Sequence, residues 1–463
     1  MSISFSRPYG RKIKVQQMFD RKLFFRLLWP VLIEQALATT IGMVNTMMVS
    51  GVGMTAISAV SIVSSLNFLI MNLFTSFATG ATVVVAQSIG AGDMDKANRT
   101  AVQSMVVCVL TAVACGIAFL IFGGATVNLL FGEAEEQVKQ YARIYLNYSA
   151  LSYPFLAAFS MASGILRGSG NTRSPMRISI LSNGINVGVG ALCIYIFGWG
   201  VSGVGIALLL SRVASACLIA LLLYHNDGVN IRKSSMKVER DTIVPVLKIG
   251  VPTCIDGLIF NGGKLIIQTF VTALGTAALA ANSIAGSITE LINIPGTSLS
   301  LVAVTMVGQA IGSRVYGKEL RKIIRSLTGY AVVFLVVTTL VTVPLLPLIT
   351  QLYSPPDDVK GMIYDVLNMV LLVMPLLWPV AFVLPSCIRS TGDSACVTVV
   401  SVLSMWFVRV LGAWFTVHYT GWGLMGIWLF WCTDWLVRGI AFIIRAKTSP
   451  YISGKHWQAQ GKL

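Results

Sequence analysis

Three acidic residues lie inside apolar stretches of the sequence, where an ionised side chain is costly to place. Glu34 and Asp256 each follow a proline by four positions, and Glu290 lies in a later apolar stretch. On insertion scales a charge at the bilayer centre costs about 2.5–3.5 kcal/mol. A carboxylate there can bind Na⁺ together with backbone carbonyls that proline frees, or hold a proton. These residues are therefore the candidates for coupling to H⁺ or Na⁺, with helix packing as the alternative role.

Basic side chains accompany the acids in the second half of the chain. Lys264 lies deep in an apolar stretch, and the antiparallel next span brings Glu290 to a similar depth. The two can form an ion pair that is either static or opened by a competing cation. Asp434 and Arg438 are spaced i, i+4 on one helix, and Arg409 on the preceding span can reach the same acid. Because this pairing satisfies the charges, it predicts a structural ion-pair cluster.

Uncharged amides are found in the first half instead. Gln35 and Asn45 on the first span, with Asn183 and Asn186 on the fifth, predict either the lining of a cavity or hydrogen bonds between packed helices. The sequence contains no HExxH, no GxSxG and no Gly-rich phosphate loop followed by lysine. Its eight cysteines are scattered singly, without the spacing of metal ligands. We therefore expect no catalytic residues, no metal site and no cofactor.

The elements that must position these residues are membrane-spanning helices. The 463 residues are 55% hydrophobic and only 11% charged, whereas soluble domains carry about 25% charged residues. Apolar runs near the roughly 20 residues that span a bilayer recur twelve times, the eighth of them over 277–309. The composition thus predicts an all-α polytopic protein of the cell (inner or plasma) membrane.

The net charge of +16 is distributed as in a membrane protein rather than a nucleic-acid-binding one. Lys and Arg gather before the first span, in the tail and in alternate loops, in which we count Arg167 and Arg389. Cytoplasmic loops carry this basic bias, so both termini are predicted to be cytoplasmic, which requires an even number of spans.

The second half of the sequence repeats the first, displaced by 222 positions. Glu34 aligns with Asp256, and LRGSGN (166–171) aligns with IRSTGD (388–393). Six spans in each half give both halves one orientation. This predicts two six-helix bundles related by a pseudo-twofold axis along the membrane normal, with a cavity between them, as in secondary transporters with parallel repeats. The predicted order is a cytoplasmic N-terminal segment, a six-helix half, a cytoplasmic linker, a second six-helix half and a cytoplasmic tail, at 1–23, 24–224, 225–245, 246–445 and 446–463.

Several segments resemble the multidrug and toxic compound extrusion (MATE) family, in the order in which that family has them. They include WPVLIEQ (29–35), VVVAQSIGAGD (83–93), ILRGSGNTR (165–173) and VGQAIGS (307–313). The resemblance implies alternating access and export driven by inward flow of Na⁺ or H⁺. The chain departs from the family where other members carry coupling acids, because Asn45 and Gly190 stand at positions where acids are expected.

Together these features predict a secondary antiporter that exports organic, cationic or amphipathic small molecules in exchange for H⁺ or Na⁺. The alternative within the same fold is a flippase for a lipid-linked precursor, which requires a strongly basic cavity. An intramembrane enzyme lacks support in the motifs, and the duplication argues against a passive channel. We expect small-molecule substrates and membrane lipid as the partners, no nucleic acid, and a monomer.

Overall fold

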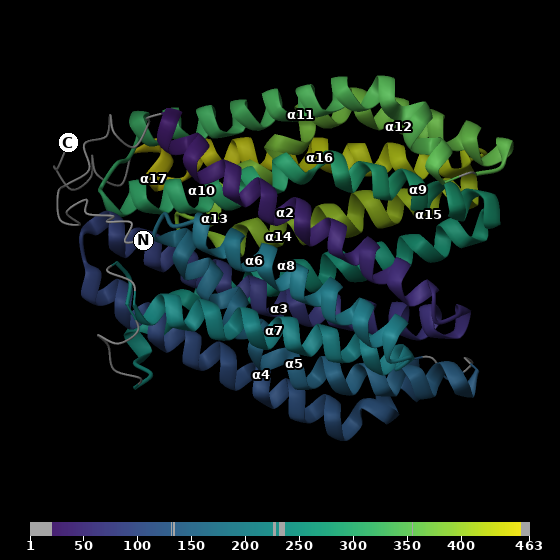
Figure 1. Ribbon diagram of the computed structural model, residues 1–463. Helices are drawn as coiled ribbons and strands as arrows, with labels where there is room; N and C mark the ends of the chain where they lie inside the picture. The colour runs from purple at the N-terminus through teal and green to yellow at the C-terminus, as the bar shows by residue number, and fades with distance from the viewer. Residues whose placement is uncertain are drawn as a thin grey trace. The chain divides into compact units, whose positions relative to one another are not determined.

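The computed structural model describes residues 21–130, 132, 135–225, 228–230, 237–353 and 355–454, and every regular element in them is helical (Figure 1). The predicted N-terminal segment up to residue 20, linker residues 226, 227 and 231–236, and the tail from residue 455 lie outside the described residues. The helices are α2 (Arg21–Ser50), α3 (Met54–Ala91), α4 (Met94–Leu130), α5 (Glu136–Gly168), α6 (Arg173–Ala191), α7 (Gly200–Tyr224), α8 (Arg240–Ala273), α9 (Thr276–Ile292), α10 (Ile294–Gly312), α11 (Lys318–Leu352), α12 (Asp357–Trp378), α13 (Leu384–Arg389), α14 (Ser394–Ser404), α15 (Leu411–Tyr419), α16 (Gly423–Thr448) and α17 (Pro450–Ser453). Three short π-helical segments, η1 (Leu192–Ile196), η3 (Pro379–Val383) and η4 (Met405–Val410), extend or join these helices.

Twelve helical spans of the described chain are long and apolar enough to cross a bilayer, which confirms the predicted all-α polytopic class. The eighth apolar run, predicted over 277–309, is divided in the structure at Asn293 between α9 and α10. Pro295 follows the break. Proline has no amide hydrogen to donate to the carbonyl four residues earlier, so one hydrogen bond of the helical ladder is missing at this point.

The described residues form two compact units, whose boundary falls between Val251 and Pro252 inside α8. The first unit contains α2 to α7 and the start of α8. The second contains the rest of α8 and α9 to α17. The sequence repeat therefore corresponds to two structural units.

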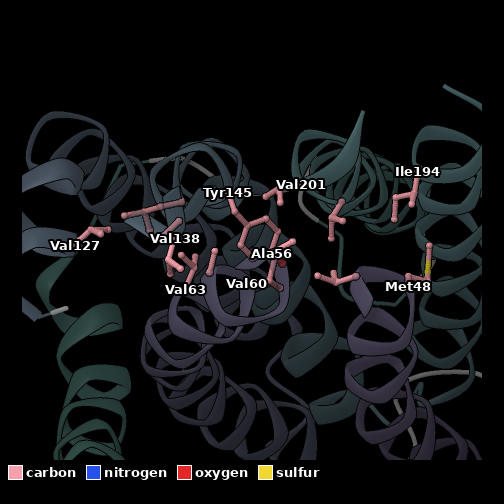
Figure 2. Close-up of a cluster of buried hydrophobic side chains, with 14 residues drawn as sticks. Met48, Ala56, Val60, Val63, Val127, Val138, Tyr145, Ile194 and Val201 are labelled. Atoms are coloured by element: carbon pink, nitrogen blue, oxygen red, sulfur yellow. The ribbon is translucent and has the colours of Figure 1, made fainter. Parts of the chain in front are cut away.

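A cluster of buried apolar side chains packs the helices of the first unit against one another. It joins the C-terminal part of α2 to the beginnings of α3, α5 and α7, and includes one residue of α4 and one of η1. Figure 2 shows this cluster, in which the labelled side chains are Met48, Ala56, Val60, Val63, Val127, Val138, Tyr145, Ile194 and Val201. This core packs the helices together at the end of the unit where α2 and α4 have their C-termini.

Small residues allow α5 to lie directly against α3. A Cβ added to Gly164 would lie 2.9 Å from the carbonyl oxygen of Ala78, and one added to Gly168 would lie 2.8 Å from that of Thr82. Such close approach matters in lipid because apolar side chains gain little by exchanging lipid for protein, so helices associate through tight backbone packing. Gly164 and Gly168 are therefore contact residues of this helix pair.

The second unit contains a corresponding contact at the same displacement in sequence. Ser390 takes the place of Gly168, and Val304 takes the place of Thr82. The hydroxyl of Ser390 donates a hydrogen bond to the carbonyl of Val304 at 3.3 Å. The two units thus use the same helix pair, packed through a glycine in one and a hydrogen-bonding serine in the other.

Replacement of Gly168 by alanine should destabilise the protein, because the new methyl group meets the fixed carbonyl of Thr82. Overpacking of this kind costs about 1–3 kcal/mol. The midpoint of thermal unfolding in detergent measures the loss. Gly184→Ala is the control, because a Cβ there meets no atom within 4 Å. Equal midpoints for the two variants would contradict the packing role of Gly168.

Candidate functional site

Glu34 is joined to an arginine from another helix of its unit. It lies in α2, and Arg167 lies in the last turn of α5. Arg167 Nη1 donates to Glu34 Oε1 at 3.0 Å, and the two side chains are only 11% and 9% exposed. The carboxylate charge of Glu34 is therefore compensated within the protein.

The second unit repeats this ion pair. Arg389, the last residue of α13, donates a hydrogen bond to the carboxylate of Asp256 in α8. These side chains are 16% and 14% exposed. Both residues lie 222 positions after Glu34 and Arg167, so the acid and its arginine partner are duplicated together.

The structure corrects the assignment of Arg167 and Arg389 to loops. Helix α5 continues to Gly168 and α13 ends at Arg389, so each arginine belongs to a helix C-terminus. A cation is favoured there by the helix dipole. The repeat could have indicated this pairing, because the acids Glu34 and Asp256 and the two arginines are each separated by the same 222 positions.

A cavity of about 150 Å³ lies within the second unit. Lys264 of α8 and Glu290 of α9 both line it, as their predicted depths suggest, but these two described side chains form no ion pair. Aromatic side chains from α8, α12, η3 and α16 make up much of the wall, namely Phe260, Trp378, Phe382, Trp431 and Trp435.

Arg409 of η4 lies behind this aromatic wall. Its side chain is 2% exposed, and its guanidinium carbon lies 3.6 Å from the ring centroid of Trp431 and 5.4 Å from that of Phe260. No acceptor in the described part of the chain hydrogen-bonds to its Nε or Nη1. Contact with ring faces stabilises a cation, but it leaves these donors unsatisfied.

Asp434 and Arg438 lie together on α16, as their spacing predicts. Arg438 Nε lies 3.3 Å from Asp434 Oδ1. The hydroxyl of Ser404 donates to the same oxygen at 2.6 Å, and Arg438 Nη2 donates to the carbonyl of Ser401 at 3.0 Å. Within the described chain Arg409 donates no hydrogen bond to this acid, but it lies close enough to interact electrostatically with both Asp434 and Arg438.

The amides predicted in the first unit occupy buried or half-buried positions. Asn186 is buried and lies 3.5 Å from the hydroxyl of Ser211 in α7. Gln35, Asn45 and Asn183 are half-buried.

A polar network that the sequence did not predict joins α3, α5 and α7. Asn67 accepts a hydrogen bond from Tyr153 and donates one to Ser149, both at 3.0 Å. Arg212 Nη1 donates to the hydroxyl of Ser152 at 2.6 Å. Among the described residues no group of three His, Cys, Asp or Glu side chains is placed to hold a metal ion.

Sequence comparison shows similarity to transporters over most of the chain. The MatE family model matches residues 30–192 and again residues 252–415. The uncharacterized transporter YisQ of Bacillus subtilis is 27% identical over 92% of this chain and 94% of its own. A protein of Thermotoga maritima described as the probable multidrug resistance protein NorM is 26% identical over 100% of this chain and 98% of its own.

Solved structures share the fold. A MOP superfamily transporter from Pyrococcus furiosus, described as having a binding pocket of reverse polarity that suggests a different function, superposes with a TM-score of 0.86. It is 22% identical, over 95% of this chain and 99% of that one. A MATE structure in the bent conformation gives a TM-score of 0.85 at 23% identity, over 93% and 96% of the two chains.

The Glu34–Arg167 pair should show strong coupling in a double-mutant cycle. Glu34→Gln removes the carboxylate charge opposite Arg167, and Arg167→Met removes the cation that compensates Glu34; breaking a buried pair costs about 3–5 kcal/mol. The double variant should recover part of the lost thermal stability. Asp357→Asn is the control, because it removes a solvent-exposed pair with Lys360 and should leave the unfolding midpoint unchanged. Additive losses in the cycle would show that the pair does not stabilise the fold.

Proposed function

Because the chain belongs to the multidrug and toxic compound extrusion (MATE) family, we propose that it is a secondary active antiporter that exports organic small molecules in exchange for H⁺ or Na⁺. The observation that carries this proposal is the double match of the family model, once in each half. Two repeats of one orientation are the design with which secondary transporters alternate access around a central site.

The names of the relatives support organic substrates. The Thermotoga maritima relative is described as a probable multidrug resistance protein. The aromatic cavity of the second unit has the chemistry to take up flat apolar molecules. On the strength of the relatives' names we propose cationic or amphipathic small molecules as the substrates, and a monomer in the cell membrane as the transporter. We further propose that both termini lie in the cytoplasm, which the basic bias of the loops and tail supports.

Of the three candidate acids, Glu290 is best placed for coupling. Glu34 and Asp256 are held by arginines, and an entering ion would have to displace a fixed guanidinium, which favours the packing role for both. Glu290 lines the cavity with Lys264 and forms no ion pair among the described residues. A proton or Na⁺ at Glu290 changes the charge of the cavity, and this can couple ion and substrate binding.

A flippase for a lipid-linked precursor is the second candidate. Lys264 and Arg409 lie at or behind the cavity wall, and positive charge is what a phosphate-bearing substrate requires. If neither a pH gradient nor a Na⁺ gradient drives dye export from proteoliposomes that contain the protein, this function is favoured over drug export.

Proteoliposomes loaded with ethidium test the antiport. A pH gradient or a Na⁺ gradient, imposed separately, should drive efflux through the wild-type protein. Glu290→Gln cannot exchange a proton or hold Na⁺ by charge, so the gradient-driven rate should fall on the order of tenfold or more. Exposed Glu319→Gln is the control and should retain coupling.

Two variants of the arginine-paired acids complete this experiment. Glu34→Gln and Asp256→Asn should lower the amount of folded protein while the remaining protein stays coupled. If either loses gradient dependence at an unchanged protein level while Glu290→Gln keeps it, the assignment of Glu290 is wrong.

A further inference from the structure

We propose that the cavity of the second unit binds the anionic group of single-ring aromatic ligands, and so serves as a carboxylate-recognising subsite. Its role in transport rests on the proposed export function, but binding itself does not. A volume of about 150 Å³ equals that of an engineered cavity of about 150 Å³ that binds benzene, so one aromatic ring fits.

Positive charge exceeds negative charge around this cavity. Lys264, Arg409 and Arg438 carry three positive charges there, against the two acids Glu290 and Asp434 among the described residues. Asp434 attracts both Arg438 and Arg409, so it compensates neither of them fully. An anion in the cavity offsets the excess positive charge by Coulomb attraction.

The aromatic rings do not form a cage for an organic cation. Such a cage offers free ring faces to the ligand, whereas here cations of the protein itself lie over them. The ring of Phe260 is approached by Lys264 at 5.3 Å and by Arg409 at 5.4 Å. Trp431 is contacted by Arg409 at 3.6 Å and stacks on Trp428 at 4.3 Å. The rings of Phe260 and Trp431 therefore offer little attraction to an organic cation.

A hydrogen-bond donor is available to hold the anion. Trp435 lines the cavity with its ring, while its indole Nε1, which has no acceptor within the described chain, is enclosed by protein atoms. Lys264 supplies an ammonium group from the α8 side. Glu290 repels an anion, so its removal should strengthen binding while removal of Lys264 weakens it.

Binding of radiolabelled benzoate to the full chain in detergent tests the proposal, with benzamide and benzylammonium as competitors of the same size. Benzoate should compete best, benzamide on the order of tenfold less well, and benzylammonium least. Lys264→Met and Arg409→Met should each weaken benzoate binding on the order of tenfold, and Glu290→Gln should strengthen it. Exposed Lys322→Met should leave the affinity unchanged.

The opposite signs at Lys264 and Glu290 keep the test decisive even if Arg409→Met does not fold. Tightest binding of benzylammonium, equal binding of all three ligands, or no benzoate binding to the folded wild type would overturn the proposal. Gradient-driven ethidium efflux without benzoate binding refutes this inference alone. Benzoate binding without any gradient-driven efflux refutes the antiport function alone.

Discussion

A carboxylate placed among apolar helices needs a fixed cation, and in each half of the chain an arginine at a helix end supplies it. The energetic reason is the high cost of an uncompensated charge away from water. Arg167 lies between Gly164 and Gly168, the residues that bring α5 against α3. The same turn of α5 therefore holds α3 by close packing and α2 by charge. In the second unit Ser390 follows Arg389 and bonds to α10, so one short segment again joins three helices.

The spans and the repeat could be predicted because the pattern that indicates each of them can be read directly along the sequence. Apolar runs report helices directly, and one displacement relates Glu34 to Asp256. The arginine partners were not predicted, because basic residues near span ends are typical of cytoplasmic loops. That bias already accounted for Arg167 and Arg389, so no ion pair with Glu34 or Asp256 was inferred. The break at Asn293 was missed because α9 and α10 are each apolar, so hydropathy runs through the interruption.

The aromatic and cationic arrangement of the second unit could not be predicted from spacing. Phe260, Trp431 and Arg409 come from three different helical segments, and aromatic residues are common throughout this apolar chain. Helical periodicity relates residues on one helix, such as Asp434 and Arg438, but not rings and cations brought together by packing between helices. The cavity is therefore a product of tertiary structure.

The two halves diverge where the displacement between them changes. Ser182 donates to the carbonyl of Ser211 at 3.0 Å, and Ser404 donates to the carbonyl of Asp434 at 3.4 Å. Ser404 lies 222 positions after Ser182, whereas Asp434 lies 223 positions after Ser211. The second unit therefore has one additional residue between Ser404 and Asp434, the interval in which η4 lies. Both intervals contain a π-helical segment, η1 in the first unit and η4 in the second, at positions that do not correspond.

Arg409 lies in η4, behind the wall of the cavity that Lys264 and Glu290 line. The corresponding helices of the first unit carry the uncharged contact between Asn186 and Ser211, and Arg212 of that unit donates to Ser152. The duplicated scaffold thus has acid–arginine pairs in both units, whereas the described cavity lined by an acid and a cation belongs to the second. Since the pairs hold the fold and the unpaired charges do not, discrimination between ligands by charge is expected to depend on the second unit.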